Sequence, residues 1–267
     1  MITFVGAGPG APDLITLRGA ARLRAADVVV WASSLVPEAL LDHCRPDVTV
    51  HDSKTMTLED VLAVYDRHPD AALVRLHSGD PAVYGAIPEQ IDWCVTSGRE
   101  FEIVPGVSSV AAAAAAVGRE LTIPRVAQSV VLTRLAGRTA ASMPERESVA
   151  SFAAHGATMA VFLSAARPDE LQAELLAPGS AYTAATPAAI VIRASWPDER
   201  VVATTVGTLA ADLTEAGATM TTLVLVGEAV ATGGSAPRSH LYDPTFTHTY
   251  RLRSAAGTTT GRGSRRS

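Results

Sequence analysis

Short runs of apolar and β-branched residues alternate, in the first half of the chain, with longer stretches whose apolar residues recur at helical spacing. The short runs predict buried strands, and the longer stretches predict amphipathic helices. Because a helix separates each strand from the next, the order predicts a mostly parallel sheet covered by helices. The expected strands are residues 2–5, 28–31, 48–51, 72–77 and 101–104, and the expected helices are residues 14–25, 37–43, 58–68, 88–97 and 107–117.

The pattern breaks at Pro124, and a second set of strands follows. Its early strands are separated by helical stretches, whereas its late strands follow one another closely and are expected to pair antiparallel. The sequence therefore predicts an α/β protein with two domains, residues 1–120 and 121–232, and a ligand cleft between them. Residues 233–267 form an extension whose low-complexity end is expected to be disordered. The expected strands of the second set are residues 129–133, 158–163, 188–193, 201–206 and 222–226, and the expected helices are residues 145–154 and 168–176.

Composition narrows the class of protein. The chain has 267 residues, 48% of them hydrophobic and 18% charged, which describes a folded protein with a large core. Its net charge is −5, but residues 251–267 contain five arginines and no acid, which leaves −10 for the rest. A body of that charge repels phosphate backbones, so no nucleic acid is expected as the main partner.

The cysteines, the histidines and the N-terminus indicate only features that we do not expect in this protein. Cys44 and Cys94 are far apart and form no C-x-x-C pair, and the histidines show no metal-binding spacing, so no disulfide framework and no metal site are expected. The N-terminus has no basic leader, and the alanine-rich run at residues 110–117 is too short to span a bilayer. We therefore expect a cytoplasmic protein that does not associate with membranes.

The first candidate binding loop is GAGPGA at residues 6–11, directly after the first strand. It satisfies the glycine pattern of dinucleotide-binding loops, which also require an acid at the end of the second strand. That strand continues into Ala32, Ser33 and Ser34 without an acid, and Pro9 lacks an amide hydrogen. The loop favours close backbone approach to a ligand, while a nicotinamide-dependent oxidoreductase and a simple tight turn remain as alternatives.

Two further loops follow predicted strands of the same sheet. SGDPAVYG at residues 78–85 places a carboxylate, Asp80, where it could accept ribose hydroxyls or oppose a cation; the alternative is an ordinary Asp-Pro turn. VPGVSS at residues 104–109 offers Ser108 and Ser109 either to a ligand or as caps of the next helix. All three loops are expected at the carboxyl edge of one sheet, where ligands bind in open α/β folds.

In this order the three loops resemble those of the tetrapyrrole methylases, whose motifs are G-x-G-P-G, G-D-P and V-P-G-[IV]-[ST]. The resemblance covers residues 1 to about 230 and implies a homodimer of two-domain subunits. It also implies that S-adenosylmethionine binds in the cleft, leaving as S-adenosylhomocysteine, with a tetrapyrrole substrate in a trough above it. Five segments look most like the family members that methylate carbon 11 of precorrin-4: residues 33–37, 56–59, 76–81, 128–134 and 193–199.

The resemblance also implies which residues contact the cofactor. Many of these contacts would be made by main-chain atoms, and Thr221 is implied by its position alone. The sequence departs from many relatives in having Ser78 in place of a common glycine, and Leu163 and Ala194 in place of other side chains. The implied cofactor contacts are Pro9, Ser78, Gly79, Asp80, Val83, Ser108, Ser109, Leu163, Ala194 and Thr221.

The candidate substrate-binding residues are chosen from the chemistry of the reaction and of the macrocycle. A sulfonium methyl group is already activated, so alignment is the main requirement, and the sequence identifies no catalytic base. Because a precorrin carries many carboxylates, the trough that binds it needs cations. The flat faces of the macrocycle need apolar side chains to pack against them. Surface solvation and core packing are the alternatives for each candidate. The candidate cations are Lys54, Arg75, Arg119, Arg134 and Arg193, and the candidate apolar contacts are Met56, Tyr84 and Trp196.

Three questions remain open from the sequence. The substrate can be metal-free precorrin-4 or its cobalt complex, because the metal would travel inside the macrocycle. Methylation of another precorrin or of uroporphyrinogen is an alternative, since sister enzymes use the same cofactor loops. A noncatalytic tetrapyrrole carrier is a third hypothesis, which predicts macrocycle binding without binding of the methyl donor.

Overall fold

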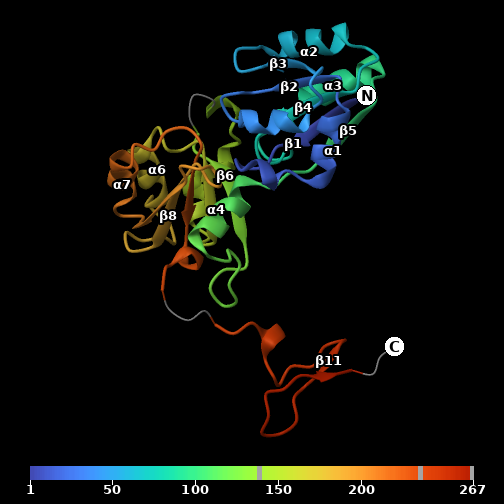
Figure 1. The fold of residues 1–267 in the computed structure, drawn as a ribbon. Coiled ribbons are helices and arrows are strands. Elements are labelled where there is room, and N and C mark those ends of the chain that lie inside the picture. Colours follow the sequence, from blue (N-terminus) through green and yellow to red (C-terminus); the bar gives the residue numbers. More distant parts are fainter. Residues whose placement is uncertain (137–139, 234–236, 265–267) are drawn as a thin grey trace.

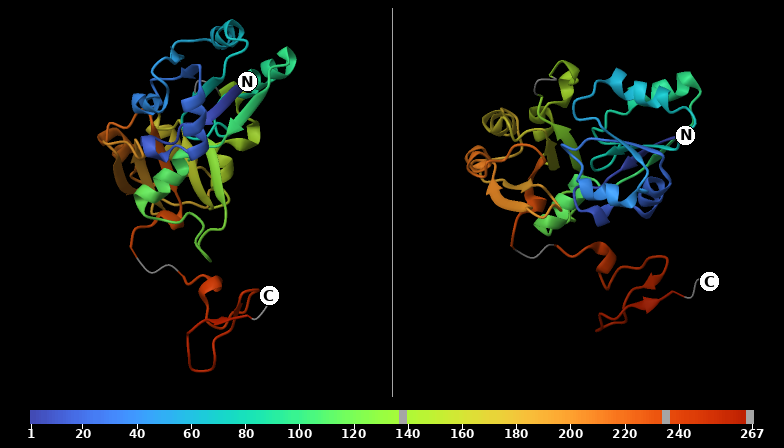
Figure 2. Two further views of the ribbon diagram at one scale, coloured as in Figure 1. Left: turned by 45° about the vertical axis from the view of Figure 1, so that its right-hand side comes forward. Right: turned by 45° about the horizontal axis from the view of Figure 1, so that its top comes forward.

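A computed structural model of the chain describes residues 1–136, 140–233 and 237–264. Two five-stranded sheets, formed by successive parts of the chain, lie beside each other with their covering helices (Figure 1). Beyond the second sheet, residues 237–264 form an arm that stands away from the rest of the protein in every view (Figure 2). No helix in the described part of the chain is long and apolar enough to cross a membrane.

The first sheet is parallel throughout, as the sequence predicts. Its strand order is β3-β2-β4-β1-β5, so β1 lies between β4 and β5, with Gly6 beside His77 and Val5 beside Val104. The loops that follow these three strands therefore leave the sheet side by side at one edge. The strands are β1 (Ile2–Gly6), β2 (Val28–Trp31), β3 (Thr49–Asp52), β4 (Leu73–His77) and β5 (Phe101–Val104).

Helices cover both faces of this sheet. The α2 helix begins with a capping box, in which the Thr57 hydroxyl accepts from Asp60 N (3.3 Å) and the Asp60 carboxylate accepts from Thr57 N (3.0 Å). The helix expected at residues 14–25 is divided, because Thr16 caps a separate helix. The segment expected at residues 37–43 is a 3₁₀ helix. These elements are η1 (Pro12–Leu14), α1 (Leu17–Ala25), η2 (Glu38–His43), α2 (Leu58–Arg67) and α3 (Pro88–Ser97).

The second sheet is mixed and has the order β6-β7-β10-β8-β9. Only β6 and β7 pair in parallel; β10 pairs antiparallel with β7 and β8, and β8 pairs antiparallel with β9. This arrangement confirms the expected antiparallel pairing of the late strands. The strands are β6 (Val130–Arg134), β7 (Thr158–Phe162), β8 (Pro187–Ile192), β9 (Arg200–Thr205) and β10 (Thr222–Val226).

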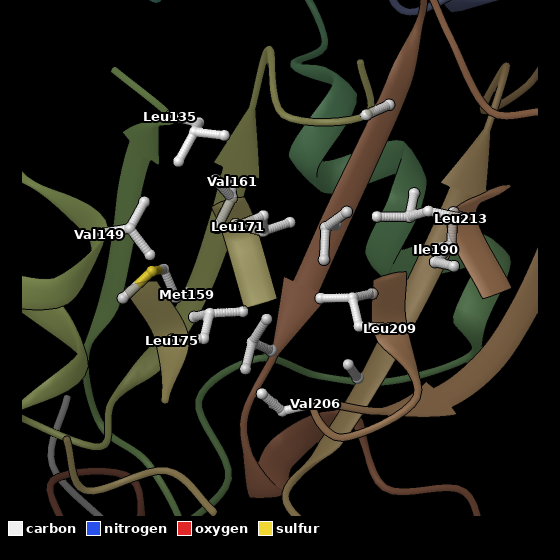
Figure 3. Close-up of a cluster of buried hydrophobic side chains, with 14 of the residues drawn as sticks. Leu135, Val149, Met159, Val161, Leu171, Leu175, Ile190, Val206, Leu209 and Leu213 are labelled. Carbon is white, nitrogen blue, oxygen red and sulfur yellow. The ribbon is translucent and has the colours of Figure 1, made fainter. Parts of the chain in front are cut away.

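A large apolar cluster fills the space between the second sheet and the helices α5, α6 and α7 (Figure 3). The opposite face is covered by α4, which follows β5 of the first sheet yet packs against β8 and β10 of the second. The division near residue 120 stays a prediction, and α4 is the element that joins the two sheets. The helical elements here are α4 (Ser109–Val117), η3 (Ala140–Ser142), η4 (Glu145–Glu147), α5 (Val149–Ala153), α6 (Pro168–Leu175), α7 (Leu209–Glu215) and η5 (Glu228–Val230).

The arm contains secondary structure where the sequence assigns none. It holds η6 (His240–Tyr242) and a short antiparallel pair, β11 (Arg251–Leu252) and β12 (Arg262–Gly263). The Arg251 guanidinium donates to the carbonyls of Leu241 (2.6 Å) and Asp243 (2.9 Å), which ties the turn to the pair. The end that is expected to be disordered includes residues 265–267, with Arg265 and Arg266, which lie outside the described residues, as do residues 234–236 of the extension.

Candidate active site

Two glycine-containing loops meet at the carboxyl edge of the first sheet. Gly8, after β1, and Gly79, after β4, form an isolated antiparallel bridge: Gly79 N donates to Gly8 O (2.8 Å), and Gly8 N donates to Gly79 O (3.2 Å). Both glycines have positive φ, +82° and +65°, a conformation that other residues adopt at a cost. The glycines therefore let two neighbouring loops bond to each other as if they were short strands.

The loop after β5 packs directly against these two. A Cβ atom on Gly106 would lie 2.1 Å from the Gly79 carbonyl oxygen and 2.7 Å from Gly6 Cα. A Cβ atom on Gly6 would lie 2.5 Å from Gly106 Cα. Because there is room only for hydrogen at both positions, the three loops form one close-packed layer.

Asp80 holds this layer together through both of its carboxylate oxygens. Oδ1 accepts from Ala82 N and Oδ2 accepts from Gly106 N, each at 2.8 Å. The first bond closes a local turn, and the second joins the loop after β4 to the loop after β5. The carboxylate that the sequence offers to ribose hydroxyls or a cation thus has a structural task within the protein.

A cavity of about 520 Å³ lies between this layer and the facing edge of the second sheet. That edge contains the end of β7, the end of β8 and the start of β10, which are neighbours in the sheet. All ten residues that the family resemblance implies as cofactor contacts line this cavity. They are Pro9, Ser78, Gly79, Asp80, Val83, Ser108, Ser109, Leu163, Ala194 and Thr221.

Several non-glycine residues around the cavity have a left-handed backbone. Leu163, Arg193 and Thr221 have φ of 51°, 53° and 53°, and Arg193 N donates to Thr221 O (2.9 Å). Each such residue costs about 1–3 kcal/mol, and strain of this kind gathers at ligand sites. Leu163 is 69% exposed, so its position is not explained by packing in a core.

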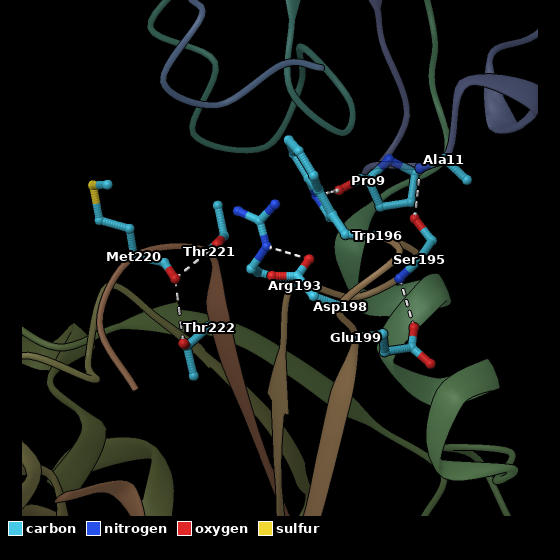
Figure 4. A network of polar contacts seen from close by, with 10 residues as sticks. All are labelled: Pro9, Ala11, Arg193, Ser195, Trp196, Asp198, Glu199, Met220, Thr221 and Thr222. Carbon is cyan, nitrogen blue, oxygen red and sulfur yellow. Dashed lines mark hydrogen bonds and ion pairs between the residues drawn. The ribbon is translucent and has the colours of Figure 1, made fainter. Parts of the chain in front are cut away.

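The segment from Arg193 to Glu199 connects the second sheet to the first. Trp196 Nε1 donates to the Pro9 carbonyl (3.0 Å), and Ala11 N donates to Ser195 Oγ (3.0 Å; Figure 4). A Cβ atom on Gly10 would lie 2.3 Å from Trp196 Cδ1, so the indole lies directly against the loop. These contacts fix the Pro9 loop to the opposite wall of the cavity.

Comparison with known proteins now identifies the family. Residues 1–210 match the family model of the tetrapyrrole (corrin/porphyrin) methylases. The chain belongs to the tetrapyrrole methylases. The family resemblance and the predicted fold class are thereby confirmed.

Two relatives of this tetrapyrrole methylase match it over nearly their whole length. The cobalt-precorrin-4 C(11)-methyltransferase of Methanocaldococcus jannaschii is 42% identical over 252 residues, 94% of this chain and 95% of the relative. The precorrin-4 C(11)-methyltransferase of a Sinorhizobium species is 42% identical over 254 residues, 94% of this chain and 98% of the relative.

Two solved structures have the same architecture as this tetrapyrrole methylase. An X-ray structure of a cobalt precorrin-4 methyltransferase has a TM-score of 0.82 and 41% identity, over 86% of this chain and 95% of its own. A uroporphyrin-III C-methyltransferase of Thermus thermophilus, in complex with S-adenosylhomocysteine, has a TM-score of 0.71 and 27% identity, over 88% of this chain and 95% of its own.

The predicted substrate residues of this tetrapyrrole methylase are not all in one place. Arg193, Tyr84 and Trp196 line the cavity, whereas Lys54, Met56, Arg75, Arg119 and Arg134 are not among the residues that line it. Met56 packs against the core of the first sheet, and the largely buried Arg75 donates to the Val30 carbonyl (3.3 Å) and Ser53 Oγ (2.9 Å). Lys54 pairs with Asp52, Arg119 donates to the Ala229 carbonyl, and Arg134 donates to Ser142 Oγ.

Several residues of the cavity wall are not among the candidates that the sequence suggests. Phe162 is one of them, and its ring meets the Tyr84 ring edge-on with centroids 5.0 Å apart, a second contact between the two sides of the cavity. The sequence signal that could identify them is a position at the end of a strand that shares an edge of the sheet with β8. The residues not named as site candidates are Leu35, Phe162, Ala165, Ala166, Val191, Thr219, Met220, Thr222 and Leu223.

His77, at the end of β4, makes stability depend on pH. Burial, aided by the nearby charge of Arg75, lowers the pKa of His77 from 6.5 to about 3, so the folded protein keeps it neutral. The unfolded chain binds a proton below pH 6.5 that the folded chain does not, so stability falls as pH falls from 6.5 toward 3. We expect His77 to lower the free energy of unfolding by about 2 kcal/mol between pH 7 and pH 5.

Urea unfolding at the two pH values measures this difference. The variant His77→Phe is expected to lose most of the pH-dependent part, whereas substitution of the exposed His155 with glutamine should retain it. An equal difference between pH 7 and pH 5 in His77→Phe and in the unaltered protein contradicts the prediction.

Proposed function

We propose that this protein transfers the methyl group of S-adenosylmethionine to carbon 11 of precorrin-4, giving precorrin-5 in corrin biosynthesis. The observation that carries the proposal is the single cavity at which the three glycine loops meet the left-handed residues of the second sheet. The names of two relatives that are 42% identical over 94% of the chain support the choice of substrate and of carbon 11. The activity of the chain is thus proposed as that of an S-adenosylmethionine-dependent C-methyltransferase.

The residues around the cavity fit the methyl donor. Its wall combines apolar side chains, such as Val83, Leu35 and Ala165, with hydroxyls of Ser78, Ser108 and Ser109 and with exposed backbone. Apolar surface suits an adenine ring, and hydroxyls with backbone groups suit a ribose and an amino acid. The main chain would make many of the contacts, which explains why Leu163 and Ala194 can stand where relatives have other side chains.

The protein's part in the reaction is alignment. The bound donor supplies a sulfonium methyl group that a carbon nucleophile attacks directly, and positioning alone accounts for several kcal/mol of such a barrier. The close-packed layer of three loops around Gly106 forms one wall of the cavity, and the hydrogen bond from Trp196 to Pro9 fixes the opposite wall relative to it. No residue is assigned as a base for a proton lost from the macrocycle.

Cobalt-precorrin-4 is a second candidate substrate. It is favoured by the Methanocaldococcus jannaschii relative and by the solved structure with a TM-score of 0.82, both named for that form. Its cobalt would be part of the substrate, carried by the macrocycle. We further propose that the protein acts as a homodimer, as the family resemblance implies, and that it does so in the cytoplasm, as its N-terminal sequence and cysteine pattern lead us to expect.

Anaerobic incubation with methyl-labelled S-adenosylmethionine tests the proposal. We expect label at carbon 11 of metal-free precorrin-4, of cobalt-precorrin-4, or of both, located by mass spectrometry and NMR; the form used faster identifies the substrate. Label at another ring carbon contradicts the assignment of carbon 11. Binding of the macrocycle without binding of S-adenosylhomocysteine favours the carrier hypothesis, and binding of NAD(P) instead favours the oxidoreductase hypothesis.

A further inference from the structure

Arg193 has a distinct position in the cavity wall. Among the described residues that line the cavity it is the one cation, and Asp80, which is engaged with two backbone amides, is the one anion. The Arg193 side chain is 35% exposed, so it is neither a core residue nor a fully solvated one. Most of the wall around it is apolar, and charges interact more strongly there than in open solvent.

Two neighbours hold the guanidinium in a fixed orientation. Arg193 Nε donates to Asp198 Oδ1 at 2.7 Å, and the guanidinium carbon lies 4.0 Å from the centre of the Trp196 ring, a cation–π distance. Trp196 is itself held by its bond to the Pro9 carbonyl. An arginine whose orientation is already fixed loses little side-chain entropy when it binds a ligand.

The end of the guanidinium makes no hydrogen bond of its own with the described part of the chain. Its terminal nitrogens, Nη1 and Nη2, have no hydrogen-bond partner among the described residues, and Figure 4 shows them pointing away from Asp198 toward the loops of the first sheet. Two parallel N–H groups on one planar edge match the two oxygens of a carboxylate. Asp198 is 64% exposed, so solvent screens its charge, and its main effect is on the orientation of Arg193.

The backbone of Arg193 also has an unusual conformation. Its φ is 53°, in the left-handed region that a non-glycine residue adopts only when its surroundings impose it. Arg193 N donates to the carbonyl of Thr221 (2.9 Å), which is itself left-handed with a φ of 53°. Arg193 directly follows β8 and lines the cavity at this point.

We infer that Arg193 is a carboxylate receptor in this cavity, with Trp196 and Asp198 as its positioning residues; the inference rests on the proposed function. Both ligands of the proposed reaction carry the required chemistry. The methyl donor has one carboxylate at its amino acid end, and the macrocycle has several at its rim. The experiment therefore has two parts, one for the carboxylate of the methyl donor and one for the carboxylates of the macrocycle.

Calorimetric titration of the full chain with S-adenosylmethionine and with its decarboxylated form tests the first source. If Arg193 binds the donor's carboxylate, the unaltered protein prefers S-adenosylmethionine over the decarboxylated form by about tenfold or more. In Arg193→Met this preference disappears, while the affinity for the decarboxylated form stays the same. Arg193→Lys keeps the charge without the planar edge and should retain part of the preference.

Steady-state kinetics with precorrin-4 tests the second source. If Arg193 binds a carboxylate of the macrocycle, Arg193→Met leaves both donor affinities unchanged and raises the KM for precorrin-4 about tenfold, with little change in kcat. A merely structural role would instead change the affinity for the decarboxylated donor or the melting temperature.

Arg22→Met is the matched control. Arg22 Nε also donates to a carboxylate oxygen at 2.7 Å, that of Glu102, and its side chain is 40% exposed, but it is not among the residues that line the cavity. This variant should leave the donor preference and the KM unchanged. If neither quantity changes in Arg193→Met, the inference is wrong while the proposed function stands; if the unaltered protein binds no donor, both are wrong.

Discussion

Replacement of Gly106 with alanine is expected to lower the free energy of unfolding by about 3 kcal/mol and to weaken binding of S-adenosylhomocysteine about a hundredfold. The added methyl group would lie 2.1 Å from the Gly79 carbonyl oxygen and 2.7 Å from Gly6 Cα. Both neighbours are backbone atoms, so no flexible side chain can move aside. The loop after β5 must therefore shift away from the loops after β1 and β4.

The shift would act on the ligand as well as on the fold. Ser108 and Ser109 follow Gly106 closely and line the cavity, so they would move with it, and a displacement of about 1 Å can cost two orders of magnitude where alignment matters. Urea unfolding gives the change in stability, and calorimetric titration at a temperature where the variant is folded gives the change in affinity.

Gly263→Ala is the control for this variant. No atom lies within 4 Å of the position where a Cβ on Gly263 would be built, and its φ is outside the range that alanine avoids. This variant should unfold and bind like the unaltered protein. If Gly106→Ala does the same, the three loops do not form the close-packed layer that the distances describe.

The sheets could be predicted because their signals are local. Each strand of the first sheet is a short apolar run between two helices, and the expected strand at residues 222–226 matches β10 at both ends. The sequence does not predict the α7 helix, because only Leu209, Ala210 and Leu213 mark it and no side chain caps it. It is stabilised by contacts with α6 and β9, which a short segment does not reveal.

Only the side of the candidate site that the first sheet contributes could be predicted from the sequence. The first-sheet loops carry glycine motifs within a few residues of each strand, so their positions follow from the chain order. The Trp196 contact with Pro9 joins residues 187 positions apart and leaves no local pattern. Arg75 was chosen as a cation for the substrate because its charge is visible in the sequence, whereas its buried environment on β4 depends on the folded structure.

Asp80→Ala is expected to weaken binding of S-adenosylhomocysteine about a hundredfold, because it removes both bonds that the carboxylate makes. Gly106 N would lose its partner at 2.8 Å, and the loops after β4 and β5 would no longer be tied together. Asp80→Asn should have an intermediate effect, because its single amide oxygen can accept from one of the two N–H groups while its NH₂ group faces the other. Calorimetric titration with S-adenosylhomocysteine compares the variants.

Asp243→Ala is the control for the Asp80 variants. Asp243 Oδ1 accepts from Thr245 N at 2.8 Å, the same local turn that Asp80 forms with Ala82, but Asp243 lies in the arm and is not among the residues that line the cavity. Loss of such a turn away from the cavity should leave the affinity for S-adenosylhomocysteine unchanged, so this variant tests whether losing an aspartate turn elsewhere in the chain can mimic the Asp80 effect. An unchanged affinity in Asp80→Ala would mean that the layer is held by its glycine contacts alone and that the carboxylate has no part in the site.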